Sequence, residues 1–100
     1  MQQIRHIHKA MRVLAVDFGA QRIGLAVGDS SYSVARPLQN LTASGTLAKD
    51  AEKITEVAGR EKADMIVIGL PLDGQGETKM SKICRKLGQC LEDKPIRVAY

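Results

Sequence analysis

Apolar residues form two continuous runs and one alternating run in the first 70 positions. Residues 13–16 and 65–68 are apolar at every position, which predicts strands over residues 12–17 and 65–70 that are covered on both faces, as in parallel sheets. Residues 23–28 alternate a large apolar side chain with glycine or alanine, so this strand is expected to turn only one face to a core. Its other face is flat enough for a helix or another backbone to approach closely.

Two later segments repeat apolar residues at helical spacing. The first predicts a helix that begins after an N-cap at Ser44 or Thr46 and ends near residues 59–62. The second predicts a helix that is opened by residues 77–78 and stopped by the Asp-Lys-Pro sequence at residues 93–95. The apolar stripe of this second helix contains Met80, Ile83, Cys84, Leu87 and Leu91.

The remaining strands are shorter. Residues 34–41 predict a third strand, and Pro37 pushes it toward an edge or a bulge because proline cannot donate to a ladder. Residues 96–100 predict a last strand. The order β-β-β-α-β-α-β indicates an α/β fold with a mixed, five-stranded sheet. Residues 1–10 show no period and are expected to be an N-terminal extension to one domain over residues 11–100.

Composition narrows the class of protein. No apolar run approaches the roughly 20 residues that cross a bilayer, and the first ten residues lack the apolar centre of a signal peptide. We therefore expect a cytoplasmic protein with no membrane partner. Cys84 and Cys90 lie six residues apart on a predicted helix, too far for a disulfide. Without a Cys/His cluster, they predict core thiols rather than a zinc site.

The charge balance favours a polyanionic partner. The formal net charge is +4, which is the sign expected for a protein that binds nucleic acid. Only Phe18, Tyr32 and Tyr100 are aromatic, so a base-stacking surface for single strands is hard to build. If nucleic acid is bound, the phosphate backbone is the expected target.

An acid stands at the tip of the first apolar strand. Asp17 directly follows the run Val-Leu-Ala-Val and precedes a glycine turn. A buried carboxylate without a partner costs free energy or shifts its pKa, so a strand end like this one requires a partner. A metal ion, or a metal bound to phosphate, would supply one at the sheet's edge.

Two motifs extend this observation. The run DFGAQRIGLAVGD at residues 17–29, followed by IGLPL at residues 68–72, resembles the YqgF/RuvX family over residues 11–100. The resemblance implies an RNase H-like fold and a metal-dependent nuclease that cleaves phosphodiesters of structured RNA or DNA. The implied reactions are 5′-end processing of pre-16S rRNA and resolution of Holliday junctions, with an rRNA precursor or branched DNA as partner and Mg²⁺ or Mn²⁺ as cofactor.

The chain departs from the family pattern in two places. The loop after Pro71 is shorter than usual, so Asp73-Gly74 matches the family's Asp-Gly only with a gap. The family also continues into an Asp-Glu-Arg motif and a final helix with another acid, whereas this chain stops at Tyr100. The resemblance therefore implies a domain truncated at its C-terminus, and an inactive nuclease is one expectation for this form. An unfinished sheet edge at Tyr100 would invite pairing with a second copy.

The resemblance implies that Asp17 is a catalytic residue and a metal ligand in an RNase H-like site of clustered carboxylates. Asp73 is a candidate second ligand because it follows the parallel strand next to the first one, although Asp-Gly is also an ordinary turn. Asp29 would lie about 16 Å from Asp17 along the hairpin, so we interpret it as a turn or capping acid. Glu77 is interpreted as complementing a helix N-terminus.

Several neutral and basic residues complete the candidate site. Arg22 could hold a phosphate or the Asp17 carboxylate, and a surface arginine is the alternative. Gly19 is expected to allow a positive φ or the close approach of a substrate backbone. Gly69 and Pro71 are expected to shape the exit of the parallel strand.

A basic face is predicted on the second helix. Lys79, Lys82 and Lys86 recur at i, i+3 and i+7 opposite the apolar stripe, with Arg85 beside them. No acid interrupts residues 79–91. This face could bind a phosphate backbone, and a solvated helix face is the alternative.

Two other functions stay open. A non-catalytic nucleic-acid-binding or scaffold domain would use the basic helix without metal or cleavage. The Asp-Phe-Gly turn at residues 17–19 also resembles the first phosphate loop of the sugar kinase/actin/Hsp70 superfamily, but those proteins need two such domains. Because no Gly-Lys-Thr/Ser loop is present, a P-loop enzyme is excluded.

Overall fold

A computed structural model describes residues 11–29, 35–71, 76 and 78–100. In chain order the elements are β1 (Arg12–Phe18), β2 (Arg22–Asp29), β3 (Ala35–Pro37), β4 (Leu41–Thr42), α1 (Leu47–Arg60), β5 (Met65–Ile68), α2 (Lys79–Glu92) and β6 (Arg97–Ala99). Neither of these helices is long and apolar enough to cross a membrane.

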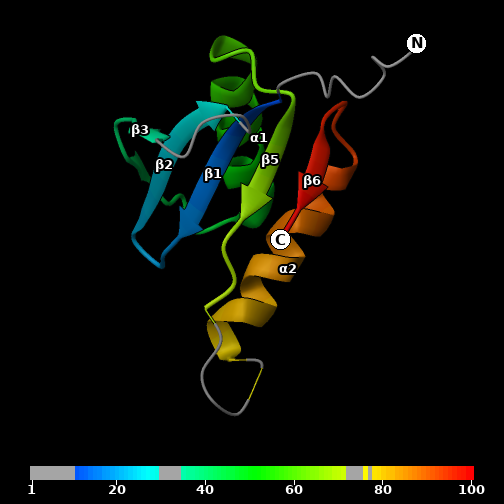
Figure 1. Ribbon diagram of the computed structural model, residues 1–100. Helices are drawn as coiled ribbons and strands as arrows, with labels where there is room; N and C mark the ends of the chain where they lie inside the picture. The colour runs from blue at the N-terminus through cyan, green and yellow to red at the C-terminus, as the bar shows by residue number, and fades with distance from the viewer. Residues whose placement is uncertain (1–10, 30–34, 72–75, 77) are drawn as a thin grey trace, which may run out of the picture.

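The strands form one mixed sheet in the order β3-β2-β1-β5-β6, with β4 paired to β2 beside this path. β1 pairs with β2 in antiparallel and with β5 in parallel orientation, and β5 pairs with β6 in parallel. This arrangement confirms the predicted α/β fold with a mixed sheet, but the predicted third strand is replaced by β3 and β4, so the described part of the chain forms a sheet of six strands rather than five. The C-terminal ends of β1 and β5 lie at the same edge of the sheet (Figure 1).

The third strand differs from its prediction. Within the described part of residues 34–41, the chain forms the short strand β3 and, after a break, joins β4. The amide of Leu38 still donates to the carbonyl of Leu25 over 2.9 Å, but Gln39 and Asn40 leave the ladder. Pro37 ends β3 at the edge of the sheet, in agreement with its missing N–H group.

Both helices lie behind the sheet in Figure 1, and the core fills the space between these two layers. The buried strand residues of this face are Leu14, Val16, Phe18, Ile23, Leu25, Val27, Ile66 and Ile68. On the front face, Ala15 is exposed and Val67 is half-buried. The prediction that both apolar strands are covered on two faces is therefore wrong for the described residues, because no described helix packs on the front face.

The two helices begin in different ways. Thr46 is the N-cap of α1 but makes no side-chain cap bond. The preceding loop is held instead by Ser44, whose amide donates to Asp50 Oδ1 over 2.8 Å. In α2 the N-cap Thr78 and Ser81 form a reciprocal capping box, which satisfies backbone donors at the helix start. Glu77 lies outside the described residues.

A cluster of charged residues lies at the N-terminal end of β1. Glu61 accepts from Arg12 and Arg36, over 3.2 and 3.0 Å. The carboxylate of Asp64 accepts from the Arg12 amide over 2.8 Å, and the Asp64 amide donates to the Arg12 carbonyl over 2.7 Å. These bonds attach the turn between α1 and β5 to the first strand. We call Arg12, Arg36, Glu61 and Asp64 the paired cluster.

Candidate active site

Asp17 lies one residue before the end of β1 and is exposed on the front face. Its neighbours Val16 and Phe18 point into the core, so the alternation of the strand fixes the carboxylate outside. Within the described parts of the chain, the Asp17 side chain has no hydrogen bond or ion pair. Its charge nevertheless acts on Cys84, whose pKa is raised mainly by burial and further by Asp17. Because Asp17 is exposed to water, the expectation of a buried carboxylate that requires a partner is wrong, and the carboxylate is free to bind a ligand.

The exit of β5 runs beside Asp17. Val16 of β1 pairs with Ile68 of β5, and the amide of Gly69 donates to the Val16 carbonyl over 3.0 Å. The Pro71 carbonyl then accepts from the Thr78 hydroxyl over 2.7 Å. Gly69 and Pro71 thus connect the strand end to the start of α2. Asp73 lies outside the described residues, so its candidate role stays a prediction.

Gly19 forms the turn between β1 and β2 for a steric reason. Its amide donates to the Arg22 carbonyl over 3.0 Å, and a Cβ at this position would lie 2.8 Å from the same oxygen. Gly19 is not among the described glycines with positive φ. The expectation of a positive φ is therefore wrong, the alternative of a close substrate backbone stays a prediction, and the Arg22 carbonyl explains why a side chain would not fit.

Asn40 is a neighbour of Asp17 that the sequence analysis missed. A Cβ on Gly24 would lie 3.5 Å from Asp17 Cβ and 3.9 Å from Asn40 Oδ1. The absence of a side chain at Gly24 thus leaves a gap on the front face between a carboxylate and an amide. No local pattern predicts that Asn40 lies near Gly24, because Asn40 stands in the break between β3 and β4.

Arg22 and Asp29 occupy opposite ends of β2. Arg22 is exposed and pairs with Thr42 of β4; its guanidinium has no ion pair within the described ranges, including with Asp17. Asp29 pairs with Arg12, five residues from Asp17 along β1. The separation expected for Asp17 and Asp29 is therefore confirmed by the register.

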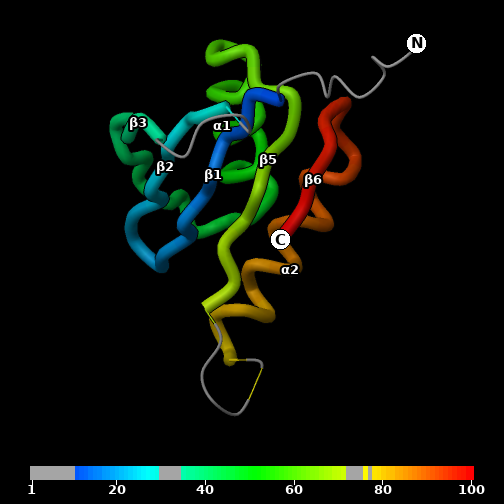
Figure 2. The backbone as a smooth tube through the Cα atoms, in the orientation of Figure 1, coloured from blue at the N-terminus to red at the C-terminus, as the bar shows by residue number. Residues whose placement is uncertain are grey.

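The basic residues of α2 are exposed, as their spacing predicts. The N-terminal half of α2, which contains Lys79 and Lys82, extends beyond the C-terminal ends of β1 and β5 (Figures 1 and 2). Arg85 has a partner, because its guanidinium carbon lies 5.5 Å from the centre of the Tyr100 ring. That ring occupies the space beside Gly88, where a Cβ would meet the Tyr100 ring and hydroxyl.

The described residues supply only part of a metal site. Asp17 and Asn40 offer a carboxylate and an amide oxygen, which are the donor types that hard cations prefer. No group of three or more His, Cys, Asp or Glu residues that could hold a metal occurs in the described parts of the chain. Since Mg²⁺ usually keeps several waters and binds through one or two carboxylates, the donor set fits an ion completed by water and substrate phosphate. This donor set does not fit a metal ion that is held by Asp17 and Asn40 alone.

The strand order, with two helices on one face and an acid near the end of the central strand β1, defines an RNase H-like fold. A family model described as RuvX, Holliday junction resolvase, matches residues 11–100. The chain therefore belongs to the RuvX family.

Curated relatives carry the name "Putative pre-16S rRNA nuclease". The chain is 40% identical over 67 residues to the protein from Mycoplasmopsis synoviae, which covers 67% of this chain and 49% of that protein. It is 39% identical over 90 residues to the protein from Chromohalobacter salexigens, covering 86% of this chain and 60% of that protein. The chain thus spans about half the length of the curated relatives it matches.

A solved structure supports the fold independently. Thermus thermophilus RuvC, in complex with a Holliday junction substrate, matches with a TM-score of 0.55 and 17% identity. The match covers 90% of this chain and 64% of RuvC. At this identity the likeness establishes the RNase H-like fold alone.

Proposed function

We propose that this chain belongs to a metal-dependent nuclease that cleaves phosphodiesters of structured nucleic acid. The observation that carries the proposal is Asp17, an exposed carboxylate without a protein partner in the described region, near the end of β1 in a RuvX family domain. An unpaired charge that the fold itself does not need is the kind of group that a functional site retains.

Each residue of the site has a chemical role in this proposal. Asp17 is a catalytic residue that holds a divalent cation, Mg²⁺ or Mn²⁺, together with water and substrate phosphate. Asn40 orients a water or phosphate oxygen on the other side of the gap above Gly24. Arg22 binds a phosphate through its guanidinium fork, which matches phosphate geometry. A cation bound there would supply an activated water and stabilise charge on the leaving oxygen.

The basic residues of α2 set the path of the nucleic acid. Lys79, Lys82 and Lys86 are exposed along one helix, and we propose that they bind phosphates on either side of the cleaved bond. Arg85 contributes the same charge but is already in contact with Tyr100. Contacts of this kind position a strand without reading its sequence.

Precursor 16S rRNA is the substrate we propose, because the curated relatives are named for it. Branched DNA is the second candidate, since the RuvX family model is described as a Holliday junction resolvase. A nuclease of rRNA precursors works in the cytoplasm, which is therefore the compartment we propose.

Two aspartates at opposite ends of the sheet provide the test. With Mg²⁺ and a labelled rRNA precursor fragment or four-way junction, Asp17→Asn should lower the cleavage rate by roughly 10²–10³-fold, as expected when a group that stabilises developing charge is removed. The free energy of unfolding should change by less than about 0.5 kcal/mol. Asp64→Asn, the matched control, should cleave at the wild-type rate.

The same assay separates the other functions. Salt-sensitive binding that survives Asp17→Asn, without cleavage at any Mg²⁺ or Mn²⁺ concentration, would replace the proposal with a non-catalytic binding module. Thermal stabilisation by ATP with Mg²⁺, without nucleic-acid binding, would replace it with a nucleotide-phosphate site.

A further inference from the structure

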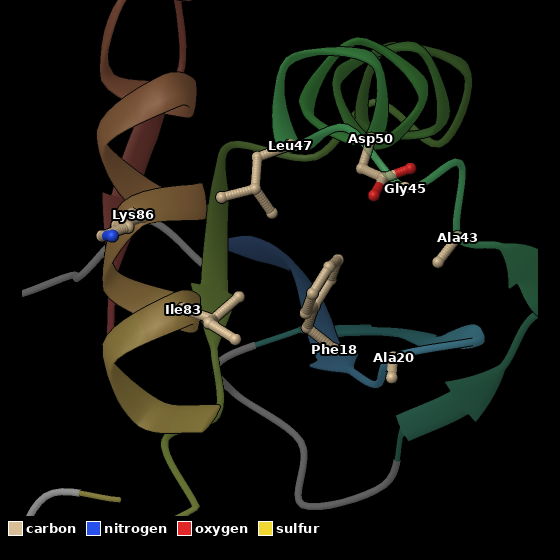
Figure 3. A pocket seen from close by; sticks show the side chains of 8 residues that line it. All are labelled: Phe18, Ala20, Ala43, Gly45, Leu47, Asp50, Ile83 and Lys86. Carbon is tan, nitrogen blue, oxygen red and sulfur yellow. The ribbon is translucent and has the colours of Figure 1, made fainter. Parts of the chain in front are cut away.

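A cavity of about 340 Å³ opens on the helix side of the sheet, beyond the end of β1. Its lining includes Phe18, Ala43, Leu47, Asp50, Ile83 and Lys86. In Figure 3 the Phe18 ring stands in the middle, Leu47 and Asp50 reach toward it from α1, and Ile83 reaches toward it from α2. The volume is at the lower end of the range for small-molecule sites, which are usually apolar with a few fixed polar groups.

The one fully buried charged group in this cavity is Asp50, which is only 1% exposed. Its Oδ1 accepts the amide of Ser44 over 2.8 Å. Its other oxygen has no hydrogen-bond partner among the described residues. A carboxylate can accept about four hydrogen bonds, and a buried acceptor left unsatisfied is costly. Because only 1% of Asp50 is exposed, a donor bound in the cavity would satisfy this acceptor once the neighbouring side chains move aside.

The cavity lies at the same edge of the sheet as Asp17. Phe18 follows Asp17 in the chain and points to the opposite face of the sheet, so the cavity and the carboxylate are separated by one strand end. Lys86, one of the basic residues of α2, also lines the cavity. A nucleotide with its phosphate at this edge could thus place its base on the helix side.

We propose that this cavity binds a guanine base. Guanine is flat and apolar on its faces, and it is the one standard base with two adjacent N–H donors, N1–H and the exocyclic amino group, on its Watson–Crick edge. Those donors match the acceptor oxygens of Asp50, and flipped bases are bound elsewhere by the same combination of edge hydrogen bonds and apolar stacking. Phe18 provides the aromatic surface. The proposal deepens the proposed function and rests on it for the natural ligand, a guanosine within the substrate strand.

The first experiment measures nucleoside binding without metal. Guanosine added to the protein should shift the methyl NMR signals of Leu47 and Ile83 in a saturable way. Inosine, which lacks only the exocyclic amino group, should bind roughly 10- to 100-fold more weakly, the range expected for one hydrogen bond to a charged group. Equal affinity for guanosine, inosine and adenosine, or no shifts with guanosine at its solubility limit, would overturn the proposal.

Two variants test the site itself. Asp50→Asn keeps an acceptor for the Ser44 amide but presents an N–H where guanine donates. It should weaken guanosine binding by roughly 10- to 100-fold and improve binding of xanthosine, whose carbonyl at C2 can accept from the new amide. Ala43→Leu fills the cavity without touching the carboxylate, since the Ala43 side chain points toward Phe18 in Figure 3. It should weaken both nucleosides equally, and retained guanosine binding in both variants would overturn the proposal.

The outcomes distinguish this inference from the proposed function. Asp17→Asn, which should lower the cleavage rate, should leave guanosine binding unchanged because Asp17 lies on the other face of the sheet. Cleavage that depends on Asp17 without any guanosine binding would contradict only the cavity. Guanosine binding that responds to Asp50→Asn, in a protein without Asp17-dependent cleavage, would contradict only the nuclease.

Discussion

At the N-terminal end of β1, Arg12 and Arg36 share the carboxylate of Glu61, whereas at the other end Asp17 and Arg22 have no charged partner in the described part of the chain. Both ends belong to the same strand pair, because Arg12 pairs with Asp29 and Asp17 pairs with Gly24. The same kinds of side chain therefore occur in two different electrostatic settings within one small sheet.

This difference between the two ends of β1 distinguishes charged residues that stabilise the fold from charged residues that can bind a ligand. In the paired cluster, the side chain of Glu61 is 18% exposed, and its bonds attach the end of α1 to the sheet. At the opposite edge, Asp17 and Arg22 pair with no charged group that the structure describes, so they remain available to a ligand. Substitutions at the first end should change stability, and substitutions at the second should change ligand binding.

The largest stability effect is expected for Glu61→Ala. It leaves the guanidinium groups of Arg12 and Arg36 without their shared acceptor, and a partly buried pair should contribute more than an exposed one. We expect the free energy of unfolding to fall by about 1–2 kcal/mol in urea titrations, with unchanged binding of nucleic acid. Unchanged stability would show that this cluster is not structural.

A pair of arginines tests the opposite prediction. Arg22→Ala should weaken oligonucleotide binding by about tenfold and reduce the salt slope by about one, as expected for one lost phosphate contact. Arg36→Ala is the matched control, because this exposed arginine belongs to the paired cluster. Fluorescence anisotropy at several salt concentrations measures both variants, and equal slopes would contradict the assignment of Arg22.

Gly24→Ala probes the gap between Asp17 and Asn40. The added Cβ would make only ordinary contacts, at 3.5 and 3.9 Å. Because glycine weakens a strand interior, stability should stay the same or rise by about 0.5 kcal/mol. The methyl group takes space beside the Asp17 carboxylate, so cleavage should fall a few-fold at limiting Mg²⁺. An unchanged rate would place the reaction away from this gap.

The smallest effect concerns alkaline pH. Burial, and then the charge of Asp17, raise the pKa of Cys84, so the folded protein keeps this proton where the unfolded chain loses it. The resulting stability is fully present below the unfolded pKa, about 8.5, and is lost as pH rises through the higher folded value. Urea titrations at increasing pH should show a shallower decline for Cys84→Ala. Asp17→Asn should also make the decline of stability with pH shallower, whereas Asp64→Asn should leave it unchanged.

Much of the fold could be predicted because its signals are local. The apolar runs, the helical stripes and the Asp-Lys-Pro stop all depend on neighbours within a few residues, and the parallel pairing of β1 with β5 follows from the element order. The position of Asp17 could be predicted for the same reason, since it ends a run that is visible in the sequence.

The rest depends on contacts between distant segments. The break between β3 and β4, which places Asn40 near Gly24, cannot be recognised from the periodicity of the sequence. The burial of Asp50 could not be predicted either, because the sequence places it among polar residues at the start of a helix. The bare front face was also missed, because an apolar run cannot show whether one or both of its faces are covered.

The contact between Gly88 and Tyr100 has a consequence for natural variation. The tyrosine ring fills the volume that a side chain at position 88 would need, and it also supports the guanidinium of Arg85. Related sequences should therefore change these positions together: a bulkier residue in the helix should occur with a smaller one at the end of the last strand.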